Sequence, residues 1–254
     1  MIEDLKGKVV LITGSSTGIG AAAARAFGAN RAKVVVHYNR SEGPARQVVE
    51  DIVRAGGEAI ALQADVTNSA AIKTLVEQTV AHFGRVDVLV NNAGDMVARR
   101  PTVELTDDFF DQVAYLNMRS MMMACKEVVP YMRKQGGGNI INVTSVAARH
   151  GGGAGAVLYA ASKGFVSTAT RGLAKEFVAD NIRVNAVSPG VIATPFQERH
   201  TSAQQMEGFR AGIPMQRVGT PDECAGTFLY LASNQLSGYV TGQIVEVNGG
   251  QFMP

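Results

Sequence analysis

The sequence is short of the residues from which metal centres and disulfide frameworks are built. It has two cysteines and four histidines among 254 residues, and no tryptophan. Cys125 and Cys224 are too far apart in the chain to form a metal-binding or redox motif, and the histidines never recur at the spacing of one helical turn. We therefore expect no metal site and no disulfide, which fits a protein of the reducing cytoplasm.

The sequence also lacks an excess of charge and a long apolar run. Its 24 lysines and arginines nearly balance 22 aspartates and glutamates, so we expect no binding to nucleic acid or to a membrane surface. No uninterrupted apolar run reaches the roughly 18–20 residues that cross a bilayer. Residues 1–6 lack the basic start and apolar core of a signal peptide, which again favours a cytoplasmic protein.

What the sequence does have is a repeated alternation of strand-like and helix-like segments. The expected strands are residues 9–12, 34–38, 58–64, 86–90, 139–143, 182–187 and 244–247. The expected helices are residues 21–27, 44–55, 68–83, 107–132 (as one helix or two), 159–177 and 221–232. This alternation predicts the α/β class, with a doubly wound parallel sheet of about seven strands and helices on both faces. No linker-like stretch divides residues 1–254, so we expect a single domain.

The first strand leads into a glycine-spaced turn, Thr13 to Gly20, which is followed by strong helix formers. Glycines let the backbone approach an anion closely, and the start of a helix offers unpaired N–H groups and a positive dipole end. The turn therefore predicts a phosphate-binding site, although a tight turn without a ligand has the same pattern. Ligands of open parallel sheets bind at the carboxyl ends of the strands, so the loops there should converge on one site.

A second group of residues carries acid–base chemistry. Tyr159 and Lys163 are four residues apart at the start of an expected helix, so they project from one face. A lysine ammonium held nearby favours the phenolate, so we expect the Tyr159 pKa to be lowered. Ser145, just after the preceding strand, should reach the same crevice, where its hydroxyl can hold a carbonyl oxygen. The tyrosine and lysine alone also fit an interface tyrosine beside a solvated lysine.

Together these motifs resemble the short-chain dehydrogenase/reductase family, of the classical type. In the family's order and at about its distances, the chain carries a TGxxxGxG turn (Thr13–Gly20), Asn91-Asn92-Ala93-Gly94, Asn117, Ser145, Tyr159-x-x-x-Lys163 and Pro189-Gly190. The resemblance covers essentially the whole chain. It implies a Rossmann-like fold and an NAD(P)-dependent oxidoreductase that interconverts a ketone and a secondary alcohol.

The resemblance also implies a role for each matching residue. Tyr159 exchanges a proton with the substrate oxygen, Ser145 orients that oxygen, and Lys163 lowers the Tyr159 pKa and binds the nicotinamide ribose. Asn117 holds a water that links Lys163 to solvent, or satisfies a helix kink, or both. The catalytic residues are thus Asn117, Ser145, Tyr159 and Lys163. Cofactor contacts are expected at Gly14, Ser16, Thr17, Gly18, Ile19, Gly20, Arg40, Ser41, Asp65, Val66, Asn92, Ala93, Gly94, Tyr159, Lys163, Pro189, Gly190, Ile192 and Thr194.

The end of the second strand selects between the two nicotinamide cofactors in this fold. A carboxylate there binds the ribose 2′-hydroxyl and repels a 2′-phosphate. The stretch from His37 to Ser41 has no carboxylate, and Arg40 with Ser41 is suited to a phosphate. Thr17 lacks the positive charge that several NADP-preferring relatives carry at that place. We therefore favour NADP(H), with NAD(H) as the alternative.

The segments that should shape the substrate pocket carry weaker signals. Residues 195–216 mix apolar and charged side chains with two glycines, and we expect them to form a mobile lid. Met96, Val97 and Met215 suggest a partly apolar pocket. The glycine-rich loop around His150 is one residue longer than in many family members and should flank this pocket, with His150 either touching substrate or facing solvent.

The substrate itself is left open by these patterns. The sequence is similar both to 3-oxoacyl-[acyl-carrier-protein] reductases and to sugar and polyol dehydrogenases of the family. Residues 136–138 and 179–181 lack the positive charge that receives an acidic carrier protein, although Arg133 and Lys134 are near.

Two further expectations concern partners and turnover. The resemblance implies a homotetramer, built through residues 107–132 and 159–177 and through the C-terminal segment 242–254. A nucleotide-binding sensor without turnover is the non-enzyme alternative, and the complete catalytic set argues against it.

Overall fold

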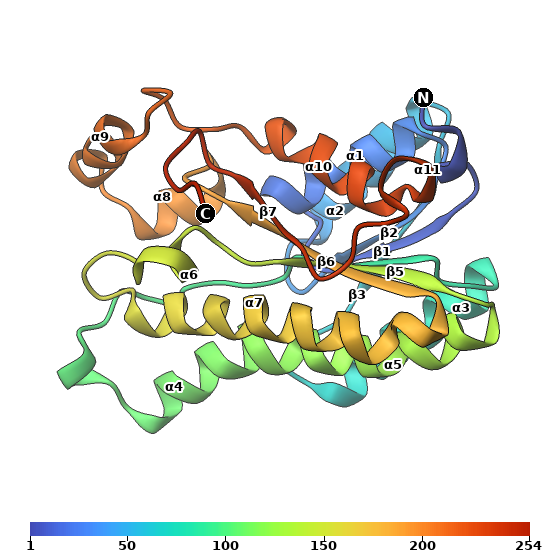
Figure 1. Cartoon of the computed structure of the whole chain (residues 1–254), viewed down its shortest axis with the longest axis horizontal. Helices are drawn as coiled ribbons and strands as arrows, with labels where there is room; N and C mark the ends of the chain where they lie inside the picture. The colour runs from blue at the N-terminus through green and yellow to red at the C-terminus, as the bar shows by residue number, and fades with distance from the viewer.

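The computed structural model describes residues 1–254 and has one parallel sheet at its centre. The strand order is β3-β2-β1-β4-β5-β6-β7, and every neighbouring pair is parallel, as the sequence predicts. The strands are β1 (Val9–Ile12), β2 (Lys33–Tyr38), β3 (Glu58–Gln63), β4 (Val88–Asn91), β5 (Gly138–Val143), β6 (Ile182–Pro189) and β7 (Ile244–Val247). The chain is a single Rossmann-like unit (Figure 1).

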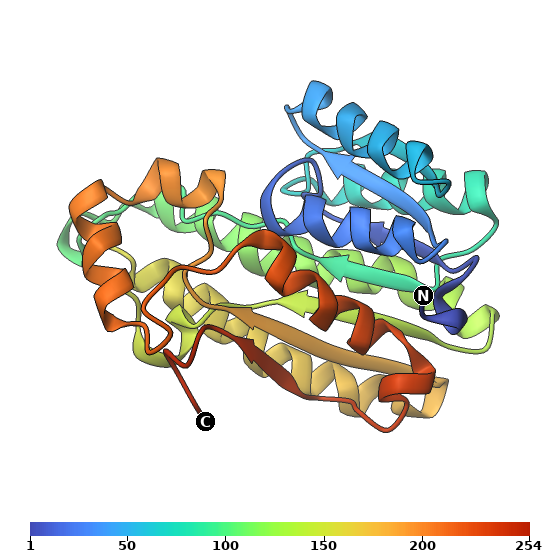
Figure 2. The same cartoon turned by 90° about the horizontal axis from the view of Figure 1, so that it is seen from above.

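Helices cover both faces of this sheet (Figures 1 and 2). One layer consists of α1 (Gly18–Ala29), α2 (Glu42–Arg54) and α10 (Pro221–Ala232). The other consists of α3 (Ser69–Phe83), α5 (Ser120–Lys134) and α7 (Val157–Phe177). Because successive side chains of a strand point to opposite faces, Val10 packs against the first layer and its neighbour Leu11 against the second. A strand buried on both faces, such as β1, is therefore apolar along its whole length, which is what the sequence signal detects.

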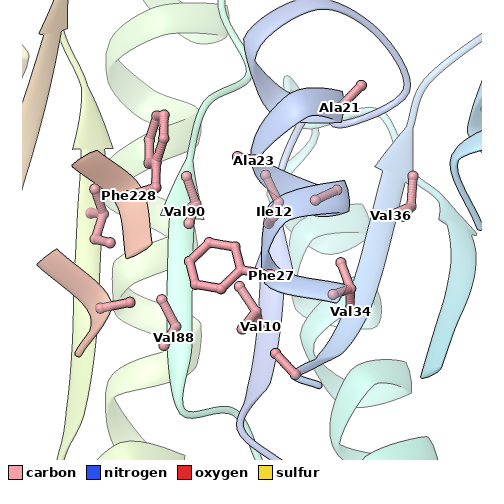
Figure 3. Close-up of a cluster of buried hydrophobic side chains, with 14 of the residues drawn as sticks. Val10, Ile12, Ala21, Ala23, Phe27, Val34, Val36, Val88, Val90 and Phe228 are labelled. Atoms are coloured by element: carbon pink, nitrogen blue, oxygen red, sulfur yellow. The ribbon is translucent and has the colours of Figure 1, made fainter. Parts of the chain in front are cut away.

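Phe27 of α1 and Phe228 of α10 are the largest completely buried side chains of the first layer. Figure 3 shows the Phe27 ring over β1 and β4, between Val10 and Val88, with Phe228 of α10 beside β4. Truncation of a buried phenylalanine to alanine typically costs about 3–5 kcal/mol, because the cavity collapses only in part. This packing fixes α1, and with it the glycine turn, on the sheet.

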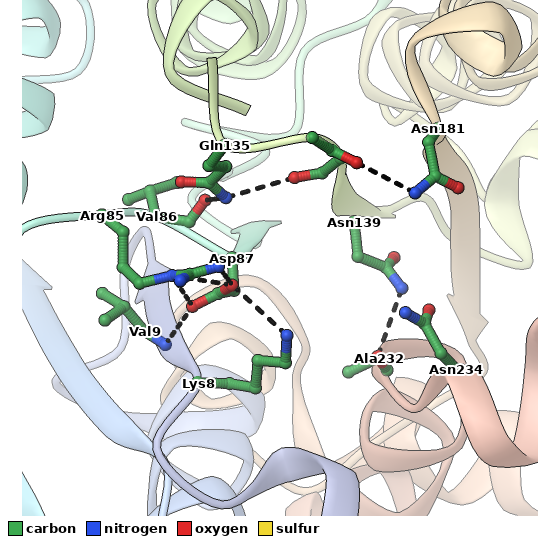
Figure 4. A network of polar contacts seen from close by, with 12 residues as sticks. Lys8, Val9, Arg85, Val86, Asp87, Gln135, Asn139, Asn181, Ala232 and Asn234 are labelled. Carbon is green, nitrogen blue, oxygen red and sulfur yellow. Dashed lines mark hydrogen bonds and ion pairs between the residues drawn. The ribbon is translucent and has the colours of Figure 1, made fainter. Parts of the chain in front are cut away.

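The amino-terminal ends of β1 and β4 are joined by a polar cluster (Figure 4). The buried carboxylate of Asp87 accepts hydrogen bonds from the Val9 amide at 2.9 Å and from Arg85 at 2.6 Å, and it pairs with Lys8 at 3.4 Å. These contacts are at the opposite end of the strands from the glycine turn, so they serve the fold and leave the carboxyl end free for the site.

Several boundaries differ from those expected. Helix α1 begins at Gly18, inside the expected turn, and Gly18 itself adopts a positive φ of 57°. The expected helix over 107–132 is α4 (Asp107–Ala114) and α5, joined by a π-helical turn, Tyr115–Arg119. The remaining short helices are α6 (Ala147–His150), α8 (Pro195–His200), α9 (Ala203–Gly212) and α11 (Asn234–Ser237). None of the helices combines the length and apolar character that a membrane span requires.

Candidate active site

The loops after the carboxyl ends of the strands enclose one cavity of about 240 Å³. The residues predicted from sequence that line it are Gly14, Thr17, Gly18, Ile19, Asn92, Gly94, Ser145, Tyr159, Lys163, Pro189, Gly190, Ile192 and Thr194. They come from the loops after β1, β4, β5 and β6, together with the start of α7. These four loops converge as expected, whereas the loops after β2 and β3 do not line this cavity.

The glycine turn has the geometry of an anion-binding loop. Gly14 and Gly18 have φ values of 64° and 57°, a region that other residues rarely adopt. A Cβ on Gly20 would lie 2.5 Å from the Gly14 carbonyl oxygen, so the turn closes only around a glycine. Thr17 precedes the helix without capping it through its side chain, so the N–H groups of the first turn of α1 keep no side-chain partner.

His37, which sequence reasoning considered only as part of the cofactor-selecting strand, holds this turn in place. Its Nδ1 accepts a hydrogen bond from the Gly14 amide at 2.8 Å, and its Nε2 lies 3.0 Å from the Ala64 carbonyl oxygen. Burial lowers the pKa of His37, so the neutral ring is favoured. Nδ1 is thereby kept as an acceptor and Nε2 as a donor, which ties β2 to both neighbouring loops.

The Asn91-Asn92-Ala93-Gly94 segment attaches the loop after β4 to the glycine turn. Asn92 donates through Nδ2 to the carbonyl oxygens of Thr13 and Gly14 at 2.9 and 2.8 Å. Asn91 donates to Asn142 Oδ1 at 2.9 Å and so ties β4 to β5, as expected. Asn92 lines the cavity and also braces its wall.

The three expected chemical groups share the cavity. Lys163 is almost completely buried, and its ammonium donates to the Val143 carbonyl oxygen at 2.9 Å. Lys163 Nζ lies 5.8 Å from the centroid of the Tyr159 ring. Ser145 Oγ accepts from the Ala147 amide at 3.1 Å, which orients this hydroxyl at the start of α6.

The pKa of Tyr159 differs from the expectation. Burial raises it to about 12, and the Ser145 hydroxyl only partly opposes this rise. The expected lowering by Lys163 is therefore wrong for the protein without its cofactor. The reason is that Lys163 occupies the same desolvated crevice, where burial lowers the lysine pKa to about 8. Burial thus favours the neutral phenol of Tyr159 and also lowers the proton affinity of Lys163.

Asn117 lies in the π-helical turn between α4 and α5. Its Oδ1 accepts from the Asp95 amide at 3.1 Å, and its Nδ2 donates to the Asp95 carbonyl at 2.8 Å. A Cβ on Gly94 would lie 2.7 Å from Asn117 Oδ1 and 3.0 Å from Lys163 Nζ, so these two groups stand on the same side of Gly94. Asn117 does not itself line the cavity. It satisfies the backbone of the loop and lies behind Lys163. This position is compatible with both expected roles, which are satisfying the helix kink and holding a water beside Lys163.

Comparison with known proteins identifies this arrangement. A family model described as enoyl-(acyl carrier protein) reductase matches residues 14–251. The chain belongs to the short-chain dehydrogenase/reductase family. It is 42% identical over 252 residues to a 3-oxoacyl-[acyl-carrier-protein] reductase of Synechocystis sp., with 98% of each chain covered. It is 39% identical to 3beta-hydroxysteroid dehydrogenase 1 of Eggerthella lenta, covering 100% of this chain and 97% of that protein.

A solved structure supports the same assignment to this family. The NADH-dependent reductase A1-R' responsible for alginate metabolism superposes with a TM-score of 0.91 at 38% identity, covering 99% of this chain and 100% of that chain. The protein is therefore an NAD(P)-dependent oxidoreductase that acts on CH–OH groups.

The segment expected to form a lid covers the cavity of this dehydrogenase/reductase. Phe196 of α8 packs against Tyr159, with ring centroids 5.5 Å apart, and His200 packs against Phe196 at 4.9 Å. Asp95 anchors the end of this helix, since its carboxylate lies 2.5 Å from His200 Nε2 and 3.1 Å from Arg199 Nη2. The sequence analysis did not find this contact, because no local pattern links Asp95 to residues 199–200.

The pocket wall differs from the expectation in two places. Met96 lines the cavity, but Val97 and Met215 do not, and Met215 is exposed. The glycine-rich loop does flank the cavity, through Gly152 and Gly153. His150 also lines it, although its side chain is exposed and its Nδ1 accepts from the Gly152 amide at 3.2 Å.

Among the cavity-lining side chains that sequence reasoning did not single out are Arg99, Arg199 and Gln251. The Oε1 atom of Gln251 is buried and has no hydrogen-bond partner in the protein. A buried acceptor of this kind is normally satisfied by a bound molecule or water.

The remaining predicted cofactor residues lie outside this cavity. They are Ser16, Gly20, Arg40, Ser41, Asp65, Val66 and Ala93. The Ser16 and Ser41 hydroxyls are 2.8 Å apart, which joins the glycine turn to the start of α2. Arg40 is exposed and forms no ion pair, and Asp65 accepts from the Thr67 amide and hydroxyl. Of these residues, Arg40, Ser41, Asp65 and Val66 follow β2 and β3, which lie on the other side of β1 from β4.

Proposed function

We propose that this protein reduces a ketone to a secondary alcohol, with NADP(H) favoured over NAD(H). The observation that carries the proposal is the placement of Ser145, Tyr159 and Lys163 in the cavity that the glycine turn also lines. A proton donor, a carbonyl-binding hydroxyl and an anion-binding turn are the parts that such a reaction needs from a protein.

The residues present fit a nicotinamide dinucleotide. The positive-φ turn at Gly14 and Gly18 opens onto the uncapped start of α1, which suits a pyrophosphate. Ile192 and Thr194 would contact the carboxamide, and Asp65 with Val66 would contact the adenine. Bound there, the reduced nicotinamide supplies the hydride.

The protein's own contribution is the proton. Because the pKa of Tyr159 is raised to about 12, its hydroxyl stays protonated at neutral pH and is ready to donate to the substrate oxygen. Ser145 holds that oxygen by a hydrogen bond. The Lys163 ammonium, 5.8 Å from the tyrosine ring, then stabilises the phenolate that donation leaves behind. Tyr159 recovers its proton from solvent, for which Asn117 and Lys163 provide the path.

The preference for NADP(H) rests on the loop after β2. Arg40 is exposed without an acidic partner, and Ser41 stands next to it. A free guanidinium and a hydroxyl at this place suit a 2′-phosphate. The similarity to the structure of an NADH-dependent reductase argues against this preference, so NAD(H) is the alternative cofactor.

A 3-oxoacyl-[acyl-carrier-protein] reductase is the second candidate, favoured by relatives of that name at 42% and 39% identity. The surface gives it little support. Arg133, which lies near the expected docking position, is paired with Asp180 at 2.8 Å, so its charge is already compensated. Sugar and polyol dehydrogenation is the other alternative, and it belongs to the same class of reaction as the proposed ketone reduction.

A homotetramer is also part of the proposal. Exposed apolar side chains on α4, α7 and the π-helical turn, such as Phe110, Phe165 and Tyr115, mark one face. A second group lies toward the C-terminal part of the chain, at Tyr239 and Met253, near the sheet edge formed by β7. Two apolar surfaces of this kind suit two different dimer contacts. Light scattering of the purified protein measures the assembly.

The direct test is turnover. The purified protein is assayed on a panel of ketones with NADPH and with NADH, together with Tyr159→Phe. We expect turnover in the parent and a loss of about 10²–10⁴-fold in kcat for the variant, with cofactor binding kept. Tight cofactor binding without turnover on any ketone or alcohol would instead establish the sensor alternative.

A further inference from the structure

The charges that line the cavity are all of one sign. Among its 30 lining residues are Arg99, His150, Lys163 and Arg199, and there is no aspartate or glutamate. Lys163 belongs to the proton chemistry. The two arginines have no part in that chemistry and belong to the substrate end, because one lies in the loop after β4 and the other in α8 over Tyr159.

Arg99 is held in place without being neutralised. Its Nε donates to the His200 carbonyl oxygen at 2.7 Å and its Nη1 to the Ala154 carbonyl oxygen at 3.1 Å. Both acceptors are uncharged, and Nη2 has no protein partner. A guanidinium fixed by two carbonyl groups keeps its full positive charge and still has N–H groups to offer. Arg99 therefore connects the end of α8 to the glycine-rich loop while its charge stays uncompensated.

Arg199 adds a second, weaker positive charge. Its Nη2 lies 3.1 Å from Asp95 Oδ2, but Asp95 shares its carboxylate with His200 at 2.5 Å. Arg99 and Arg199 also line a neighbouring hollow with Asp95 and His200, so both stand at the rim where the cavity meets the surface. An anion that enters the cavity passes these two groups.

We propose that the physiological substrate is an oxo acid, whose carboxylate is bound by Arg99 while its ketone faces Tyr159 and Ser145. This inference rests on the proposed function and names the substrate class of the same site. A carboxylate matches the planar fork of a guanidinium, and the bond is charge-assisted. Arg199, which lies in α8, strengthens the attraction for the carboxylate. Substrate binding therefore also holds α8 over the site, so that binding and covering of the site are coupled.

The proposal separates this protein from two of the relatives reported above, the 3-oxoacyl-[acyl-carrier-protein] reductase and the 3beta-hydroxysteroid dehydrogenase. A steroid ring and an acyl chain held as a carrier-protein thioester present no carboxylate beside the ketone. An arginine that is fixed in place but has no acidic partner would not favour binding of a steroid or an acyl thioester, because desolvating an uncompensated charge in a pocket is costly.

The test compares matched pairs of acid and ester. 2-, 3-, 4- and 5-oxo acids of five to six carbons, and their methyl esters, are assayed with the cofactor that the protein prefers. We expect kcat/KM for the best acid to exceed that of its ester by about ten- to a hundredfold, the range of one charge-assisted hydrogen bond. Equal values for acid and ester, or a preference for the ester, would overturn the proposal.

Three variants assign the effect. Arg99→Gln should lower kcat/KM for the acid far more than for the ester, so that the difference between them disappears, and Arg99→Lys should restore part of the difference. Arg100→Gln is the matched control, because Arg100 lies next in sequence but stacks on Phe109 and does not line the cavity. An equal loss for acid and ester in Arg99→Gln would show a merely structural arginine.

Failure of the proposed function gives a different result. If neither acids nor esters nor other ketones are turned over, the reductase activity is wrong. The carboxylate site is then judged by calorimetry, in which the oxo acids and the corresponding hydroxy acids are titrated into the protein with saturating cofactor. Binding of acids that is lost in Arg99→Gln supports the anion site by itself, and absence of any binding rejects it.

Discussion

The carboxylate of Asp95, in the loop after β4, lies 2.5 Å from Nε2 of His200, the last residue of α8. The backbone of the same Asp95 is held by the Asn117 side chain through both its N–H and its C=O. His200 in turn packs on Phe196, and Phe196 on Tyr159. One aspartate thus connects the helix that covers the site to the catalytic framework behind it.

Asp95→Asn should loosen this cover. The amide keeps the shape of the side chain and the backbone contacts to Asn117, but removes the charge that holds His200 and Arg199. We expect a loss of about 1–2 kcal/mol of local stability, because the pair is partly exposed. Hydrogen exchange of residues 195–216 should then accelerate about tenfold, with a raised KM. Glu198→Gln, an exposed change on the same helix, is the control, and equal exchange in both variants would contradict the anchoring role.

The pH dependence of reduction should report Lys163. Burial lowers its pKa to about 8, so the ammonium is lost as pH rises through that value, and kcat/KM should fall there. Lys163→Arg, weaker overall, should lose this descending limb because a guanidinium stays protonated. Asp95 attracts the ammonium and raises its pKa, so Asp95→Asn should move the limb to lower pH. A limb at the same pH in all three proteins would assign it to another group.

The buried ammonium should also cost stability. The pKa of Lys163 is lower in the folded protein than in the unfolded chain, so the unfolded chain binds the proton more tightly between about pH 8 and 10.5. Stability from this group is therefore lost as pH falls through about 8. Lys163→Met should be inactive yet more stable at pH 7 by about 1–3 kcal/mol. Denaturant unfolding at pH 7 and at pH 10.5 measures this, and the gain should shrink at the higher pH.

Cofactor choice should depend on Arg40. Arg40→Ala removes the charge proposed to bind the 2′-phosphate, and we expect kcat/KM with NADPH to fall by about ten- to a hundredfold while the value with NADH stays the same. Arg46→Ala is the control, because Arg46 is an exposed arginine of α2 already paired with Glu42. An unchanged NADPH-to-NADH ratio in Arg40→Ala would mean that selection lies elsewhere.

The glycine turn should tolerate no side chain at Gly20. A Cβ there would lie 2.5 Å from both Asn92 Nδ2 and the Gly14 carbonyl oxygen. Gly20→Ala should therefore destabilise the protein by about 1–3 kcal/mol and weaken cofactor binding. Gly43→Ala, at the start of α2 with nothing within 4 Å, should be neutral or slightly stabilising. Thermal unfolding with and without NADPH distinguishes the two variants, and equal melting temperatures would contradict the crowding of the turn.

The fold and the chemical core of the site could be predicted because their signals are local. β1 is a short apolar run buried on both faces, β7 is a β-branched run at the edge of the sheet, and both have the expected bounds. The four-residue spacing of Tyr159 and Lys163 fixes their common face once α7 is a helix. The order of the loops then follows from the sheet.

What could not be predicted depends on distance through space. Asp95 and His200 are 105 residues apart, and neither belongs to a motif. The pKa of Tyr159 is raised because α8 and the surrounding segments bury its side chain. The sequence around Tyr159 reveals only the nearby charge of Lys163, which would lower that pKa. Arg99 has no signal in the sequence, because the carbonyl groups that hold it belong to Ala154 and His200, which are distant in the chain.

The π-helical turn at Tyr115–Arg119 has a consequence for how this chain tolerates insertions and deletions. A π-helical turn holds one residue more than the regular helix around it. Removal of Met118 would let α4 and α5 run on as one regular helix. Asn117 would then rotate away from the Asp95 backbone that it supports. Shortening the chain at this turn would therefore regularise the helix and release the loop after β4.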